Sequence, residues 1–145
     1  MQTIPEAPEV QEELAPRLRW AITRMARRLR QEAGTDLGPS QTAALATIER
    51  HGPLSPSELA KRERIKRPTA TRILRHLEVA GLLERVRDPE DGRASILSVT
   101  PEGRQLLRRL RARKTAYLAK RLDGLTPEDR LTLERAAELL EGMLE

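Results

Sequence analysis

The chain has 145 residues, contains no cysteine, and carries a net charge of +5 at pH 7. This length permits a single core of ordinary size, the missing cysteine excludes disulfides, thiolate metal sites and thiol redox switches, and the positive charge favours a polyanionic partner. With no Phe, one Trp and one Tyr, the chain also lacks the stacking platforms on which single-stranded nucleic-acid binding usually relies.

The first third of the chain predicts a leader followed by a helix. Residues 1–11 hold prolines, acids and little apolar sequence, so we expect a flexible leader and not a signal peptide. Apolar side chains spaced three and four residues apart then predict a helix from Glu12 or Pro16 to Ala33, which Gly34 ends. Arginines occupy its remaining faces, as on a solvated or partner-facing surface.

Two more helices are expected next, from about Pro39 to His51 and from Pro56 to about Arg62. Ser55 is predicted to cap the second of these helices, because proline suits the first helical position and Glu58 completes a capping box. A tight turn then leads into a further helix, so these elements together describe a helix-turn-helix.

The helix that begins near Pro68 has one apolar and one basic face. Seven Lys or Arg and one acid lie between Lys61 and Arg75. Such a face attracts a duplex phosphate backbone, and short donors in the first turn can reach base edges in a major groove, although a solvated surface helix would look similar. The candidate DNA-binding residues here are Ser55, Lys66, Arg67, Pro68, Thr69, Thr71, Arg72, Arg75 and His76.

A β-hairpin is expected after Gly81, with strands at 82–87 and 94–99 joined by a turn rich in proline, glycine and acids. An ordinary hairpin would explain this pattern, but directly after a helix-turn-helix it predicts a wing. Arg93 at its tip is a candidate for the minor groove, where the potential is most negative. Asp91 is predicted to hold an arginine in place.

The C-terminal part predicts two helices, from Thr100 to about Leu122 and from Leu125 to the end. The last helix is apolar on more than one side, so it needs a partner beyond its own core. Together with the first helix it suggests a helical dimerisation layer, and a twofold dimer is the commonest closed assembly.

Several motifs resemble those of the MarR family of winged helix-turn-helix transcription regulators. They are the segments 54–60, 68–78 and 81–85, the wing 88–93 and the junction 97–103. The resemblance covers residues 12–145, beyond the leader expected at 1–11. It implies a mainly α fold with a small β-hairpin, a dimerisation helix at 12–35, a winged helix-turn-helix at 36–100 and dimerisation helices at 101–145. It also implies a homodimer that binds a pseudo-palindromic operator in double-stranded DNA and often releases it when a small anionic or phenolic ligand binds.

Two positions depart from the family pattern. Lys66 and Arg67 stand where Ser or Thr often caps the recognition helix, and we hypothesise that a DNA phosphate accepts from the free amides in place of that cap. Gly92 stands where a second basic residue is common, so the wing contact should be weaker or more mobile.

Candidate ligand residues lie on three predicted helices: Trp20, Arg24, Arg28, His51 and Tyr117. They could converge on an anion between the dimer layer and the reading head, but aromatic packing and solvated arginines explain them as well. Neither histidine has another ligand at metal spacing, and no nucleophile, phosphate-loop or paired-carboxylate motif indicates an enzyme or a cofactor.

The sequence thus predicts a sequence-specific, cytoplasmic DNA-binding regulator, a ligand-responsive repressor, with no membrane contact. A winged-helix protein that coats or bends DNA without sequence preference is the alternative. The two differ in whether operator DNA is preferred over random DNA.

Overall fold

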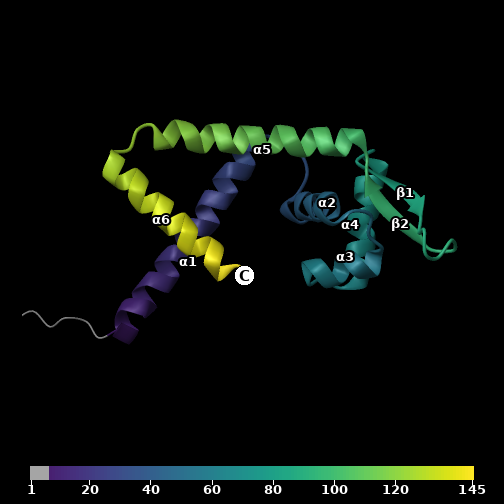
Figure 1. The fold of residues 1–145 in the computed structure, drawn as a ribbon, viewed down its shortest axis with the longest axis horizontal. Coiled ribbons are helices and arrows are strands. Elements are labelled where there is room, and N and C mark those ends of the chain that lie inside the picture. The colour runs from purple at the N-terminus through teal and green to yellow at the C-terminus, as the bar shows by residue number, and fades with distance from the viewer. Residues whose placement is uncertain (1–6) are drawn as a thin grey trace, which may run out of the picture.

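The structure is a computed structural model that describes residues 7–145 of the chain (Figure 1). Helices dominate it, and a single two-stranded hairpin interrupts their order in the described part of the chain. The elements are α1 (Ala7–Ala33), α2 (Pro39–His51), α3 (Pro56–Glu63), α4 (Arg67–Val79), β1 (Leu83–Arg87), β2 (Ser95–Val99), α5 (Pro101–Leu122) and α6 (Pro127–Met143).

The core lies where α2, α3, α4 and the hairpin meet beneath the first half of α5 (Figure 1). Leu45, Leu59, Leu77 and Leu107 from four of these helices are almost completely buried. Burying a leucine side chain stabilises the fold by roughly 1.5–3 kcal/mol, so this cluster holds α2, α3, α4 and the hairpin together without any aromatic residue. The predicted mainly α fold with a winged helix-turn-helix is confirmed.

The hairpin is antiparallel, with Leu83 opposite Val99 and Arg87 opposite Ser95. Leu54, in the connector before α3, extends it by one bridge, because the Leu54 N–H donates to the Leu97 carbonyl at 3.1 Å and the Leu97 N–H donates back at 2.9 Å. The connector, α3 and the wing therefore form one packed unit.

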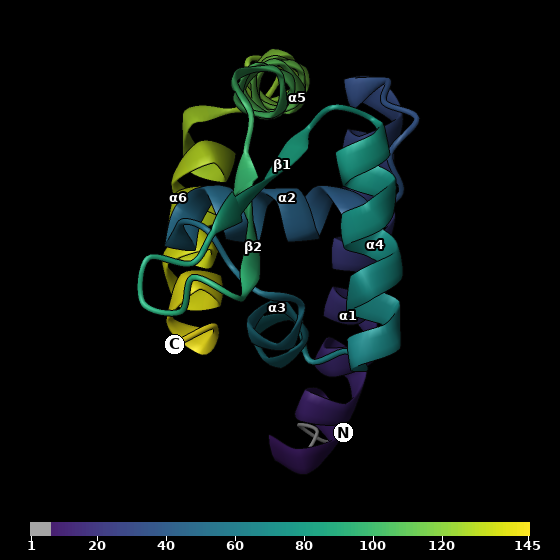
Figure 2. The same ribbon diagram turned by 90° about the vertical axis from the view of Figure 1, so that its right-hand side faces the viewer.

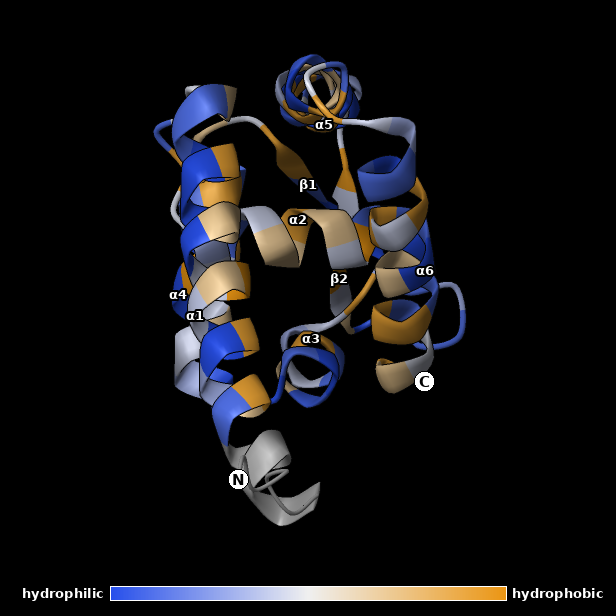
Figure 3. Ribbon diagram, turned by 90° about the vertical axis from the view of Figure 1, so that its left-hand side faces the viewer, coloured by the Kyte–Doolittle hydropathy of each residue, from blue (hydrophilic) through white to orange (hydrophobic). Residues whose placement is uncertain are grey.

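The terminal helices form a second layer beside this unit. α1 packs against α5, while α6 folds back from the far end of α5 (Figures 1 and 2). None of the residues of α6 is buried, and Leu131 and Met143 remain 66% and 72% exposed. Along α1, Trp20 is 64% exposed, and in Figure 3 the hydrophobic colour runs along both helices.

The start of α1 differs from the prediction, because the helix begins at Ala7 instead of at Glu12 or Pro16. Pro8 lies in the first turn, where a missing N–H has no helical partner to lose. Pro16 stands inside the helix, and sequence reasoning treated it as a start signal. Residues 1–6 of the predicted leader lie outside the described residues. No helix in the described range has the length and apolarity that crossing a membrane requires.

The capping predictions for α3 and α5 are confirmed. Ser55 and Glu58 form the reciprocal capping box of α3. The Thr100 hydroxyl accepts from the Gly103 N–H at 3.1 Å and donates to the Gly81 carbonyl at 2.7 Å. A single side chain thus starts α5 and fixes the turn that follows α4.

Gly103 is expected to be intolerant of any side chain. A Cβ at this position would lie 2.4 Å from the Leu82 carbonyl oxygen and 2.8 Å from a Val99 methyl group. Gly103→Ala should therefore lower the free energy of unfolding by about 1–3 kcal/mol, measured by urea denaturation. Gly92→Ala is the matched control, because nothing lies within 4 Å of its added Cβ. Equal stabilities would contradict this packing.

Candidate nucleic-acid interface

α4 separates its apolar and basic side chains onto opposite faces. Ala70, Ile73, Leu74 and Leu77 are buried in the core. The candidate DNA-binding residues Thr71, Arg72, Arg75 and His76 are exposed on the outer face, and Thr69 is half-buried at its edge. The core residues fix the helix while its donors and charges stay in water, which is the arrangement that a recognition helix needs.

The start of α4 has the free amides that the sequence predicted. Lys66 is the N-cap residue and makes no side-chain capping hydrogen bond. Pro68 has no N–H, and the first amide of this turn that is satisfied by the helix is that of Ala70, which donates to the Lys66 carbonyl at 3.0 Å. The Arg67 and Thr69 amides therefore point out of the helix start, where an anion is favoured. The side chains of Lys66, Arg67 and Pro68 are exposed.

α3 presents Ser55 in a different way from the α4 residues. Its hydroxyl accepts from the Glu58 N–H at 3.2 Å, and its own N–H donates to the Glu58 carboxylate at 3.3 Å. Ser55 is half-buried, and the cap uses one acceptor lone pair of its hydroxyl, so that the hydroxyl proton is left for another partner.

The wing tip carries Arg93 in solvent, and Asp91 contacts this residue through its backbone instead of through the guanidinium. The Asp91 carboxylate accepts from the backbone N–H of Arg93 at 3.1 Å, and no ion pair joins it to an arginine within the described residues. A short acidic side chain contacts the backbone of its own turn more easily than it contacts a guanidinium. Asp91 therefore shapes the tip, and the Arg93 side chain remains free.

Sequence reasoning missed the ion pair between Glu78 on α4 and Arg85 on β1. The Arg85 Nε lies 2.9 Å from the carboxylate of Glu78, so the pair ties the end of the recognition helix to the wing. Glu63 at the end of α3 likewise accepts a hydrogen bond from Thr47 on α2. Both contacts join different elements, and no local pattern in the sequence marks them.

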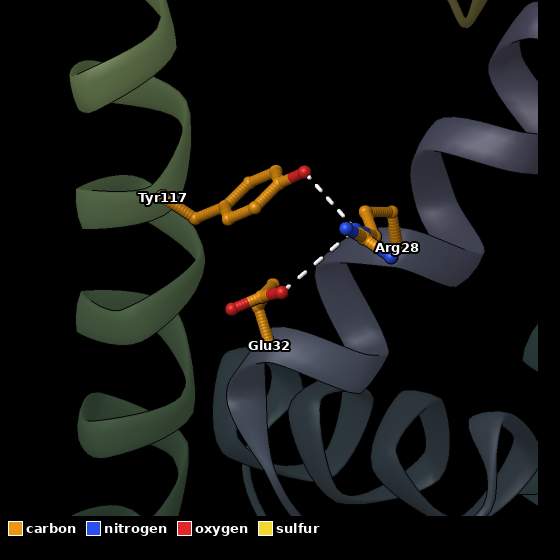
Figure 4. A network of polar contacts seen from close by, with 3 residues as sticks. All are labelled: Arg28, Glu32 and Tyr117. Carbon is orange, nitrogen blue, oxygen red and sulfur yellow. Dashed lines mark hydrogen bonds and ion pairs between the residues drawn. The ribbon is translucent and has the colours of Figure 1, made fainter.

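The candidate ligand residues fall into separate groups. Arg28 donates to the Tyr117 hydroxyl at 3.2 Å and lies 3.8 Å from the Glu32 carboxylate (Figure 4). The hydrogen bond raises the pKa of Arg28, which stays cationic. The guanidinium of Arg24 lies 5.9 Å from the centre of the Trp20 ring.

His51 does not join these residues. It is exposed at the end of α2, and no hydrogen bond or ion pair connects it to the other four in the part of the chain that the structure describes. A cavity of about 360 Å³ lies instead between α1, α2 and α5. It is lined by Ala26, Leu29, Arg30, Pro39, Thr42, Ala43, Ala46, Leu107, Leu110, Arg111 and Lys114. None of the five candidates lines it, so the sequence prediction named different residues of these helices.

Two short helices, a basic recognition helix and a two-stranded wing define the class as a winged helix-turn-helix DNA-binding protein. The family model for the MarR family matches residues 37–95. An HTH-type transcriptional regulator of Mycobacterium tuberculosis is 34% identical over 133 residues, which are 91% of this chain and 93% of the relative. The chain belongs to the MarR family of transcription regulators, and the resemblance seen in the sequence is confirmed.

Solved structures agree with this assignment. A transcriptional regulator from Pseudomonas aeruginosa is 34% identical, with a TM-score of 0.83 over 97% of this chain and 99% of that one. A MarR family protein from Bacillus stearothermophilus shares the fold, with a TM-score of 0.82 at 22% identity over 97% of this chain and 99% of the other.

The uncapped start of α4 yields a prediction with opposite effects on stability and binding. Lys66→Ser supplies a hydroxyl that can accept from the Thr69 N–H, and Lys66→Gln removes the same charge without that cap. The serine variant should be more stable than the glutamine variant by about 1 kcal/mol. It should bind operator DNA about fivefold more weakly, because the cap occupies an amide that a phosphate would use.

Urea denaturation and fluorescence anisotropy on a labelled operator duplex measure the two effects. Equal DNA affinities of the serine and glutamine variants, with the serine variant more stable, would show that no phosphate uses these amides.

Proposed function

We propose that the protein is a sequence-specific repressor that acts as a homodimer on a pseudo-palindromic operator and has no catalytic role. The observation that carries this proposal is the outer face of α4, where Arg72 and Arg75 are exposed beside free amides and a wing. The HTH-type transcriptional repressor MdtR of Bacillus subtilis is 34% identical over 93 residues, 64% of this chain and 60% of that protein. This relative supports a repressing role.

Exposed apolar surface supports a homodimer. Large hydrophobic side chains on α1 and α6 are exposed in the single chain: Leu14, Leu18, Trp20, Ile22, Met25, Leu131, Leu133, Leu139, Met143 and Leu144. Exposed apolar side chains gathered on two helices are typical of a protein–protein interface. A second copy offers the same two helices, and a twofold arrangement would place one recognition helix on each half-site.

The cavity between α1, α2 and α5 supports control by a ligand. Its volume of about 360 Å³ is adequate for a small molecule. Leu107 and Leu110 provide an apolar wall, while Arg30, Arg111 and Lys114 supply positive charge at its lining. A small anionic or phenolic compound fits these surroundings.

We also propose that the protein works in the cytoplasm, because a repressor must reach its DNA target there.

A DNA-coating protein without sequence preference remains the second candidate, because the same basic face would serve it. The two are separated by anisotropy on a duplex from upstream of the protein's own gene and on a scrambled duplex, across a salt series. A repressor should prefer the native duplex by about a thousandfold or more. Equal affinities, repeated on duplexes selected from random sequence, would refute the sequence-specific proposal.

Arg72→Ala and Arg75→Ala should each weaken operator binding by about 1–3 kcal/mol. A side chain that reads a base should also relax specificity at one base pair, whereas a phosphate contact should weaken all sequences alike. Arg93→Ala should weaken operator binding most where the flanking minor groove is narrow. Anisotropy on a panel of singly substituted operators measures these effects, and unchanged affinity on every duplex would exclude α4 from the interface.

Charge on the apolar face of α6 should disrupt the dimer. Leu140→Glu combined with Leu144→Glu would bury two unpaired carboxylates on association, so sedimentation should shift from dimer to monomer and operator affinity should fall at least tenfold. Thr132→Glu adds charge at an exposed polar position of the same helix and is the control. A monomeric variant with full operator affinity would contradict the proposed assembly.

A further inference from the structure

α5 carries more positive charge than either recognition or packing explains. It contains eight Lys or Arg and one acid, Glu102, so its net charge of +7 exceeds the +5 of the entire chain. Its buried positions are Gly103, Leu107 and Leu110, which are all uncharged.

Only part of this charge is used within the chain. Arg111 pairs with Glu49 at 2.8 Å, and Arg113 donates to the Ala33 carbonyl at 2.8 Å. The guanidinium of Arg121 lies 3.7 Å from the centre of the Tyr117 ring. No ion pair within the described residues involves Arg104, Arg108, Arg109 or Lys120, and all four are exposed.

The unpaired cations flank a line of uncharged residues, of which three are alanines. With about 3.6 residues per turn, the positions opposite the buried face form one line along the helix. The residues of this line are Gln105, Ala112, Ala116 and Ala119, all exposed. Arg104 and Arg108 lie on one side of it, and Arg109 and Lys120 on the other. We call the line and its four flanking cations the α5 ridge.

The α5 ridge lies on a different side of the molecule from the outer face of α4. α5 forms the upper edge of the described chain in Figure 1, and Figure 2 shows it end-on above α4 and the hairpin. Its buried residues face the core below it. The ridge therefore faces away from the body, and a partner can approach it without displacing DNA from α4.

This geometry fits duplex DNA better than other polyanions. A major groove about 12 Å wide admits one helix, a ridge of alanines allows close approach to its floor, and cations on both sides can reach the phosphates of the two strands. From Arg104 to Lys120 the helix spans about 24 Å, the length of roughly seven base pairs. The ridge has no large apolar residue, which an interfacial membrane helix would need.

We propose that the α5 ridge binds a second DNA duplex, so that one molecule seated on its operator through α4 can hold another DNA segment. The second contact depends on backbone charge and carries little sequence preference. It extends the proposed function, because the recognition helix does not take part in it.

A capture assay tests the proposal. An operator duplex is fixed to beads, full-length protein is added, and retention of a fluorescent scrambled duplex is measured across a salt series. The test variant is Arg104→Gln with Arg108→Gln and Arg109→Gln. The matched control, Arg17→Gln with Arg19→Gln and Arg130→Gln, removes three exposed charges from α1 and α6, and sedimentation must show that it associates as the wild type does, because these helices form the proposed dimer surface.

Wild type and control should capture the second duplex, and the α5 variant should capture at least fivefold less while its operator affinity stays within twofold. The slope of log affinity for the second duplex against log salt should fall by about 3, at roughly 0.9 for each lost phosphate contact. Equal capture by all three proteins, or none by the wild type, would overturn the proposal.

A second arm separates this proposal from the function of α4. In the background Arg72→Ala with Arg75→Ala, residual binding to the scrambled duplex should persist and should vanish when the three α5 substitutions are added. Persistence of that binding without the α5 arginines would overturn the proposal, even if operator recognition by α4 failed its own test. If the α5 variant lost binding to phosphatidylserine vesicles but captured the second duplex as well as wild type does, the ridge would be assigned to a membrane surface instead.

Discussion

The hydroxyl of Thr100 holds the interaction on which the rest of the structure depends. It accepts from the first turn of α5 and donates to the Gly81 carbonyl at the turn after the recognition helix. β2 leads directly into Thr100, so three elements meet at one buried side chain. Gly103 permits this meeting because the Leu82 carbonyl occupies the space of a side chain. The orientation of α4 relative to the long helix α5, and hence to the whole terminal layer, is fixed at this junction.

Positive charge is distributed over this frame in separate places. The outer face of α4 and the wing tip carry one group of cations, the lining of the cavity between α1, α2 and α5 carries another, and the outer side of α5 carries a third. The buried faces of α4 and α5 are free of charge. The buried leucines therefore set the orientation of each basic face, and the chain has several surfaces for anions while its core remains apolar.

Local signals in the sequence predicted most of this architecture. Ser55 with Glu58 and Thr100 with Pro101 act within one helical turn, so their spacing alone identifies the helix starts. Asp91 contacts Arg93 through the backbone N–H and not through the guanidinium, because a carboxylate in a tight turn bonds to its own backbone first. The pair Glu78 and Arg85 and the separation of His51 from Tyr117 depend on how elements pack. Periodicity within one element carries no information on such contacts.

The bare surface of α6 has a consequence for the life of the protein in the cell. A helix with no buried residue gains little from the fold of its own chain. In the proposed homodimer its order would come from association, and unpaired chains would offer proteases an easily opened segment. Turnover would therefore fall as the number of molecules rises, because pairing follows mass action. The abundance of such a regulator would be set partly by its own assembly, in addition to the rate at which it is made.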